Sequence, residues 1–135
     1  MIAKNSNQAA FWAHCISVCL FVVLGGGASL AADPLELEKL LRHSDFSWDV
    51  DSTAHFRIYV QPRLYADQNI AVVKDRLEEA HRRARRLLGA EAYEETIHVF
   101  YVESRQEMSR LIGREPAGVA NAGFHTVVLV YNATW

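Results

Sequence analysis

The clearest pattern in the chain is a run of apolar residues with helical spacing between residues 66 and 88. Gly89 follows directly, where a helix often ends in a left-handed residue. A second, shorter helix is predicted to start at Ser104, which has capping-box spacing to Glu107, and to end before Gly113. The residues expected to face inward are Ile70, Val73, Leu77, Ala80, Ala84, Leu87 and Leu88 in the long helix, and Met108, Leu111 and Ile112 in the short one.

Other parts of the chain alternate with the period of a strand. Apolar residues alternate over 46–50 and again over 56–60, and Pro62 ends this segment. Residues 97–102 are apolar on both faces, which is typical of a central strand covered on two sides. Residues 126–131 form the last predicted strand. The Pro, Gly and Asn content of residues 114–124 predicts a loop between the second helix and this last strand.

The order strand, helix, strand, helix, strand predicts a small α/β domain, with α+β as the alternative. We expect a mixed sheet of three to four strands with one long covering helix. The long first crossover predicts that the first two core strands are parallel, whereas the direction of the last strand is left open. A short N-terminal helix is expected to begin at Asp33 and Pro34, with Glu36 in capping-box spacing, and to bury Leu37, Leu40 and Leu41.

Residues 1–32 have the pattern of a secretory signal peptide: Lys4, an apolar stretch over 16–24, three glycines, and the small residues "ASLAA". The apolar stretch is shorter than the roughly 20 residues that a membrane-spanning helix needs. Cleavage is expected after Ala31 or Ala32. The sequence therefore predicts three segments: a signal peptide (1–32), a short N-terminal helix and lead-in (33–51), and one α/β domain (52–135). It predicts an exported protein, periplasmic or extracellular, with no stable membrane span after cleavage.

Composition excludes several classes of site from the exported product. Both cysteines, Cys15 and Cys19, lie in the signal segment, so neither disulfides nor thiolate metal ligands remain. Without Lys4 the chain keeps 13 of its 14 basic and all 16 acidic residues, a net charge of −3 that does not suggest nucleic acid. The basic run "HRRARR" at 81–86 is interpreted as a solvated helix face, because Glu78 and Glu79 stand four residues before two of its arginines and no aromatic residue is interleaved.

The histidines do not show the spacing of a metal or catalytic site. Five remain after export, none three or four positions from another, and no H-E-x-x-H occurs: they are His43, His55, His81, His98 and His125. His81 is interpreted as solvated, and His98 as buried and hydrogen-bonded. His55 and His125 each precede a strand, so an enzyme using both at one sheet edge is kept as a hypothesis.

Ser104 is interpreted as a helix cap, and Asp49 and Asp51 as solvating a turn. We therefore assign no catalytic, cofactor-binding or metal residue.

Four segments together resemble the leading part of the peptidase MA-like domains, which are gluzincin-type zinc metallopeptidases. The segments are "STAHFRIYV", "RRARRLLG", "ETIHVFYVESRQEMSRLIG" and "AGVANAGFHTVVLVY", which span residues 52–131. In that family a small sheet precedes a helix bearing H-E-x-x-H, and a later glutamate completes the zinc site. The resemblance implies that this chain supplies the sheet that forms the wall of a cleft, while positions matching the catalytic residues would lie beyond Trp135.

The resemblance thus leads to a first functional expectation, an exported peptidase-like domain that is truncated before its catalytic segment. Such a domain would be inactive alone, and its last strand would be uncovered. No cofactor is expected, and zinc only if a missing C-terminal segment is present. The alternative is a complete small exported binding module that recruits a peptide or protein through its sheet edge. The sequence leaves the substrate, the partner and the oligomeric state open.

Overall fold

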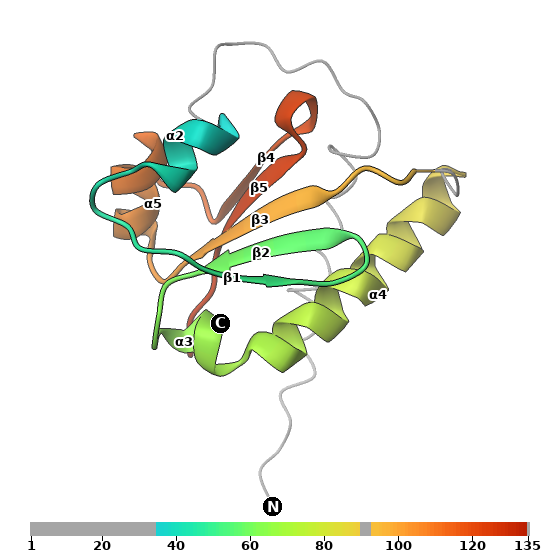
Figure 1. The fold of residues 1–135 in the computed structure, drawn as a ribbon, viewed down its shortest axis with the longest axis horizontal. Coiled ribbons are helices and arrows are strands. Elements are labelled where there is room, and N and C mark those ends of the chain that lie inside the picture. The colour runs from blue at the N-terminus through green and yellow to red at the C-terminus, as the bar shows by residue number, and fades with distance from the viewer. Residues whose placement is uncertain (1–34, 90–92, 135) are drawn as a thin grey trace, which may run out of the picture.

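The computed structural model describes residues 35–89 and 93–134, which form a five-stranded sheet with helices on both faces (Figure 1). The small mixed α/β fold that the sequence predicts is confirmed. The elements in chain order are α2 (Leu37–Leu41), β1 (Asp49–Ser52), β2 (Phe56–Val60), α3 (Tyr65–Gln68), α4 (Ile70–Leu88), β3 (Ile97–Val102), α5 (Arg105–Ile112), β4 (Gly118–Asn121), the 3-10 helix η1 (Ala122–Phe124) and β5 (Thr126–Val130).

The strands lie in the order β1-β2-β3-β5-β4. The three inner strands β2, β3 and β5 are parallel, which confirms the parallel first crossover and settles the direction of the last strand. The two outer strands are antiparallel to their neighbours. The expected number of strands, three to four, is therefore too low, because residues 118–121, predicted to be a loop, form β4. Gly118 and Ala120 are small, so this four-residue strand carries little apolar alternation.

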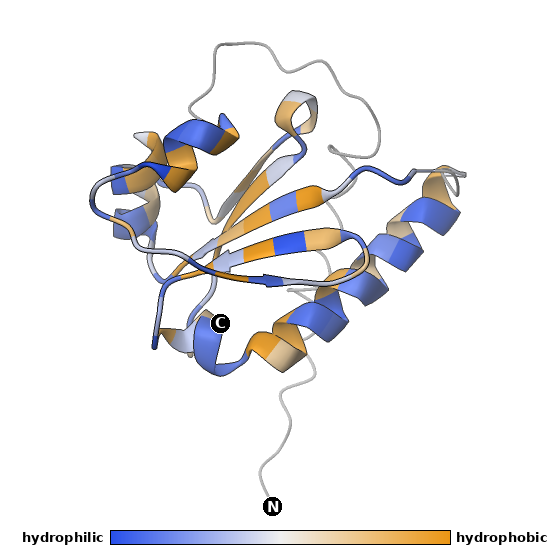
Figure 2. Ribbon diagram, in the orientation of Figure 1, coloured by the Kyte–Doolittle hydropathy of each residue, from blue (hydrophilic) through white to orange (hydrophobic). Residues whose placement is uncertain are grey.

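The core has two layers, one on each face of the sheet (Figures 1 and 2). Alternate residues of β3 divide between them as predicted: Ile97, Val99 and Tyr101 pack in the layer beneath α4, and Phe100 and Val102 in the layer beneath α2 and α5. All five residues of β5 are buried, and β5 lies between β3 and β4. The expectation of an uncovered last strand is therefore wrong.

The predicted long helix is divided at Asn69 into α3 and the 19-residue α4. Gly89 ends α4 in the left-handed region, with φ of 63°, and its N–H donates to the carbonyl of Arg85, which confirms the predicted cap. Four predicted inward residues are buried: Val73, Leu77, Ala80 and Ala84. Leu87 is 62% exposed and Leu88 36% exposed, so the prediction for these two is wrong. The last turn of α4 extends beyond the strands that it would cover (Figure 1).

The predicted cap of α5 is confirmed in its main contact. The N–H of Glu107 donates to Ser104 Oγ at 3.1 Å. The Glu107 carboxylate accepts from the N–H of Glu103 at 2.7 Å, one residue before the cap, and from Gln61 Nε2 at 3.0 Å. Gly113 ends the helix with φ of 78°. The three predicted apolar residues of α5 are buried, so this helix joins the sheet as expected.

We expect Ser104→Ala to lower the free energy of unfolding by about 1 kcal/mol, since it removes the side-chain acceptor for the Glu107 N–H. Urea unfolding followed by circular dichroism measures this difference. Ser47→Ala, at an exposed residue in the loop before β1, is the control and should leave stability nearly unchanged. Equal effects of the two substitutions would contradict the capping role.

The N-terminal helix is shorter than predicted. It begins after Glu36, whose side chain makes no capping hydrogen bond, and Leu40 is its buried residue. Leu41 is 39% exposed, so its predicted burial is wrong, and Leu37 is partly buried. Asp33, Pro34 and the predicted signal segment lie outside the described residues. Within residues 35–89 and 93–134, no helix has the length and apolarity to cross a membrane.

Candidate functional site

A tight turn between β1 and β2 fixes the position of His55. The N–H of Thr53 donates to the carbonyl of Phe56 at 2.9 Å, and the N–H of Phe56 donates to Thr53 Oγ1 at 3.1 Å. Ala54 and His55 form the tip between them. The carbonyl of His55 accepts from the N–H of Ile97 at 2.9 Å, so the backbone of His55 is held by both the turn and β3.

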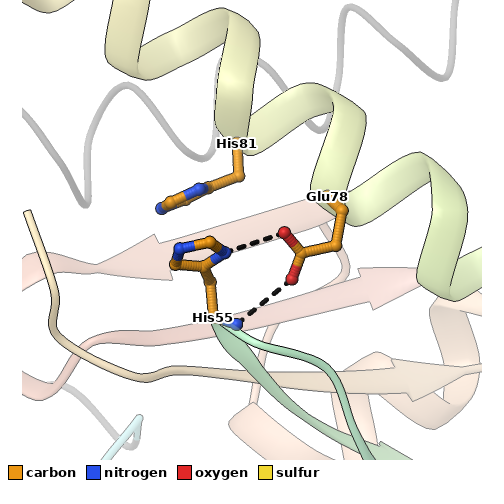
Figure 3. Close-up of side chains that lie close together, drawn as sticks. All are labelled: His55, Glu78 and His81. Atoms are coloured by element: carbon orange, nitrogen blue, oxygen red, sulfur yellow. Dashed lines mark hydrogen bonds and ion pairs between the residues drawn. The ribbon is translucent and has the colours of Figure 1, made fainter. Parts of the chain in front are cut away.

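Helix α4 supplies two more polar side chains beside this turn. Glu78 and His81 are three residues apart, so they lie on one side of the helix. Leu77 and Ala84 of the same helix are buried against the sheet, which brings that side of α4 close to β2. As Figure 3 shows, both side chains point toward His55.

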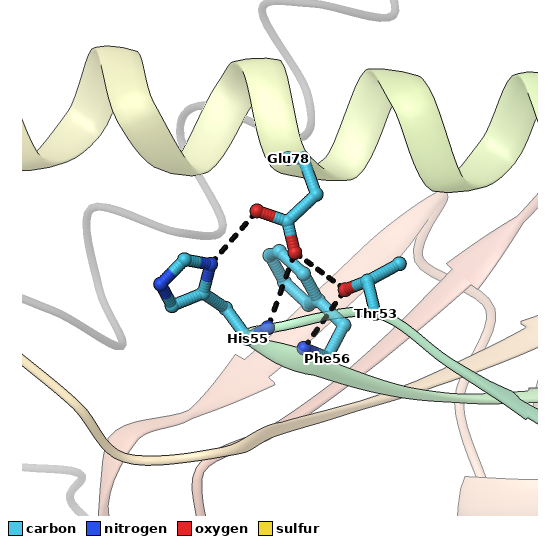
Figure 4. Close-up of polar contacts among 4 residues, drawn as sticks. All are labelled: Thr53, His55, Phe56 and Glu78. Atoms are coloured by element: carbon cyan, nitrogen blue, oxygen red, sulfur yellow. Dashed lines mark hydrogen bonds and ion pairs between the residues drawn. The ribbon is translucent and has the colours of Figure 1, made fainter.

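The Glu78 carboxylate connects α4 to the turn (Figure 4). Its Oε2 lies 2.8 Å from His55 Nδ1, and its Oε1 accepts from the Thr53 hydroxyl at 2.5 Å and from the N–H of His55 at 3.1 Å. Burial acts to raise the pKa of Glu78, but the hydrogen bonds from Thr53 and His55 outweigh it, so the pKa is lowered. The four-residue spacing from Glu78 to Arg82 suggests an ion pair on the helix surface, but this carboxylate is instead directed to the turn between β1 and β2.

His81 is fully buried, which overturns its interpretation as a solvated residue. Its ring stacks on His55 with centroids 4.2 Å apart and planes at 27°, and meets the ring of Phe56 edge-on at 5.6 Å. Neither ring nitrogen has a hydrogen-bond partner. Burial, followed by the neighbouring His55, lowers the pKa of His81 to about 4. Its spacing to Leu77 and Ala84, four and three residues away, is a signal of burial that the sequence did contain.

The three side chains form the one group of potential metal ligands found among the described residues. One ligand atom from each of His55, Glu78 and His81 lies within 4.8 Å of the others. Sequence reasoning missed this cluster because it looked for paired histidines and for H-E-x-x-H. The E-x-x-H spacing on α4 was a detectable signal for two of the members, but no local pattern pointed to His55.

The other candidate histidines have different partners. His98 Nδ1 lies 3.0 Å from Tyr59 Oη, which confirms the predicted hydrogen bonding, although the residue is only partly buried. Burial, then Arg57 and His125, lower the pKa of His98. His125 Nδ1 lies 2.6 Å from Tyr93 Oη.

His55 and His125 do lie at the same end of the sheet. The carbonyl of His55 accepts from Ile97 and that of His125 from His98, so β3 stands between the two residues. Their imidazoles bind different partners, Glu78 and Tyr93. The structure therefore does not bring them together as a catalytic pair.

The outer edge of β4 is a second candidate site. In an antiparallel pair, residues alternate between those that bond to the partner strand and those whose backbone groups point away. The N–H of Val130 donates to the carbonyl of Ala117 at 2.9 Å, so with the observed register Val119 and Asn121 face β5. Gly118 and Ala120 consequently direct their N–H and C=O groups outward.

The outer edge of β1 is less open. The hydrogen bond from Thr53 to Phe56 sets the same alternation here, so Val50 and Ser52 direct their backbone groups outward. The N–H of Ser52 already donates to Asp51 Oδ1 at 2.7 Å. Asp51 also pairs with Lys74 at 2.9 Å, and the hydrogen bond from Lys74 lowers its pKa. Charged side chains of this kind discourage strand pairing at a sheet edge.

Comparison with known proteins gives no match: no family model, curated protein or solved structure corresponds to this chain. The resemblance to peptidase MA-like domains therefore remains a prediction from the residues quoted above.

Proposed function

We propose that this protein is an exported, peptidase-like binding domain that holds an extended peptide along β4 and does not cleave it unaided. The observation that carries the proposal is the outer edge of β4, where Gly118 and Ala120 direct backbone groups away from the sheet. The resemblance to the wall of a peptidase cleft and the predicted signal peptide support it. The absence of H-E-x-x-H from the sequence supports the lack of hydrolysis.

Strand addition explains how such an edge binds. Two outward residues offer two N–H donors and two C=O acceptors, each worth about 0.5–1.5 kcal/mol when paired. Because Gly118 has no side chain and that of Ala120 is a single methyl group, a second backbone can approach closely. Phe124, which ends η1 directly after β4, is 44% exposed and offers an apolar contact beyond the strand. Main-chain pairing of this kind gives modest affinity with little sequence preference.

The test compares proline substitutions at the two sheet edges. We expect Ala120→Pro to weaken peptide binding about tenfold, because proline removes an outward N–H and crowds the edge. The fold should be retained, since an outward-facing edge position tolerates proline. Ser52→Pro is the matched control at an outward position of β1 and should bind peptide like the unsubstituted protein.

The probe is the tightest binder selected from a library of random hexapeptides, titrated into isotope-labelled protein. Amide shifts should concentrate at residues 118–121. Shifts centred on β1, an unchanged affinity of the Ala120→Pro protein, or a library with no binder would each overturn the proposal. Cleavage of the selected peptide by the purified protein would refute the non-catalytic part alone.

A further inference from the structure

We propose that His55, Glu78 and His81 bind one divalent transition-metal ion, with zinc as the preferred occupant. This site lies at the turn between β1 and β2, and the proposal is independent of peptide binding at β4. No metal residue is expected from the sequence, so the proposal differs from that expectation. Two imidazoles and one carboxylate are a donor set that zinc commonly takes in proteins, and nitrogen-rich sites of this kind exclude magnesium and calcium.

The unpartnered imidazole of His81 is the strongest argument for a ligand. Buried polar side chains nearly always have a hydrogen-bond partner, and one without a partner requires an explanation. His81 is 0% exposed, and both of its ring nitrogens lack a partner. A metal ion held between His81, His55 and Glu78 would satisfy one of these nitrogens.

The surroundings hold the carboxylate in place. Glu78 Oε1 accepts from the Thr53 hydroxyl and from the backbone N–H of His55. Such contacts orient a ligating carboxylate and leave its other oxygen, Oε2, for the ion. The backbones are equally fixed, because His55 bonds to β3 and Glu78 lies in the middle of the 19-residue α4.

In the present arrangement the three ligand atoms lie near one another, but their separations and directions are not those of a bound metal ion. Ligand atoms around tetrahedral zinc lie roughly 3.3 Å apart, given bonds of about 2.0–2.1 Å. The three ligand atoms here lie within 4.8 Å of one another, and His55 Nδ1 is hydrogen-bonded to Glu78. The two rings are also stacked, so the in-plane lone pairs of their nitrogens do not meet at one point. Metal binding therefore requires a rotation of the His55 ring that breaks its bond to Glu78.

Solvent can reach the site from the side of the turn. The side chain of His55 is 28% exposed and that of Glu78 is 25% exposed, whereas His81 forms the buried end. Three protein ligands leave a fourth position of the ion open toward that exposed side, as in zinc sites that bind water or a further group.

The experiment titrates Zn²⁺ into the full-length protein in competition with a chromophoric chelator. The protein carries Cys15→Ser and Cys19→Ser, so that no thiolate competes for the ion. We expect one zinc per chain, with binding weakened about 100-fold by His81→Gln or His55→Gln and about tenfold by Glu78→Gln. Glu78→Gln keeps an acceptor for Thr53 and the turn, so it tests ligation with the fold intact. His43→Gln, in the loop before β1, is the matched control and should change affinity less than twofold.

A spectroscopic readout separates ligation from a purely structural role. Zinc should shift the imidazole nitrogen resonances of His55 and His81 and leave those of His43 and His98 in place. Co²⁺ should give the intense visible absorption of a low-coordinate site, and Glu78→Gln should alter that spectrum. The proposal is overturned if zinc fails to bind at one equivalent, if His43→Gln weakens binding as much as His81→Gln, or if the His55 and His81 resonances do not respond.

Discussion

Phe100→Ala is expected to lower the free energy of unfolding by about 3–5 kcal/mol, the usual range for removing a buried phenylalanine ring. Phe100 is 0% exposed and lies on β3, the central strand of the sheet. Its ring stacks on Tyr59 with centroids 4.2 Å apart and meets Trp48 edge-on at 5.1 Å. Since a domain of this size has roughly 5–15 kcal/mol of stability in total, the substitution removes a large fraction of it.

Urea unfolding monitored by circular dichroism measures this effect. Phe124→Ala is the matched control, because it removes the same ring from an exposed position, 44% accessible, and should cost less than about 1 kcal/mol. Phe100→Leu leaves a smaller void and provides a measurable intermediate if the alanine variant does not fold. A smaller loss for Phe100→Ala than for Phe124→Ala would show that the layer beneath α2 and α5 does not carry the expected share of the core.

His81→Leu is expected to make the metal-free protein more resistant to acid. Burial and the neighbouring His55 lower the pKa of His81 from the ordinary value of 6.5 to about 4. Between these two values the unfolded chain binds a proton that the folded protein does not, so stability is full above pH 6.5 and falls as the pH drops toward 4. This difference between the two pKa values corresponds to a loss of roughly 3 kcal/mol in the free energy of unfolding, complete only below pH 4.

Burial sets the sign of this effect on the pKa of His81, and the charged groups that face the ring modify it. His55 and Arg85 oppose its protonation, whereas Glu78 favours it, and burial is larger than any of them. Replacement by leucine removes the titration and the unpartnered ring nitrogens together. Replacement by glutamine removes the titration but keeps a buried polar group. Both variants should therefore lose the part of the pH dependence that His81 causes, and only His81→Leu should be more stable than the unsubstituted protein at pH 7.

Thermal unfolding in the presence of EDTA, at pH values from 7.5 to 4.5, provides the measurement. The chelator is necessary because a bound ion would stabilise the folded protein through the same residue. If the leucine variant shows the same dependence on pH as the unsubstituted protein, the acid sensitivity arises elsewhere, for example from His98 or Glu78, whose pKa values are also lowered.

Much of the fold could be predicted from local patterns. Helix α4 was predicted by its apolar period and ended correctly at Gly89, and β3 was identified as central because it is apolar on both faces. The cap of α5 at Ser104 followed from capping-box spacing. Each of these features depends on residues close together in the chain, so the sequence carries a strong local signal for it.

The errors concern features that depend on distant parts of the chain. The sequence of β4 has no periodic apolar signal. These residues form a strand because their backbone groups pair with those of β5. Leu87 and Leu88 continue the apolar period of α4, yet they are exposed. The last turn of α4 extends beyond the strands (Figure 1). The arginine neighbours of His81 predict a solvated position, although its spacing to Leu77 places it on the inward side of the helix.

The sequence by itself thus determined most elements of this protein but not β4: it indicated the main helical segments, where two helices end, and which strand is central. Only the tertiary structure decided the candidate sites. His55 is 23 residues from Glu78, and the two meet only because α4 packs across the sheet beside the turn before β2. The outward groups of β4 likewise depend on its register with β5. Contacts between distant residues are set by how whole elements pack, and no local spacing encodes them.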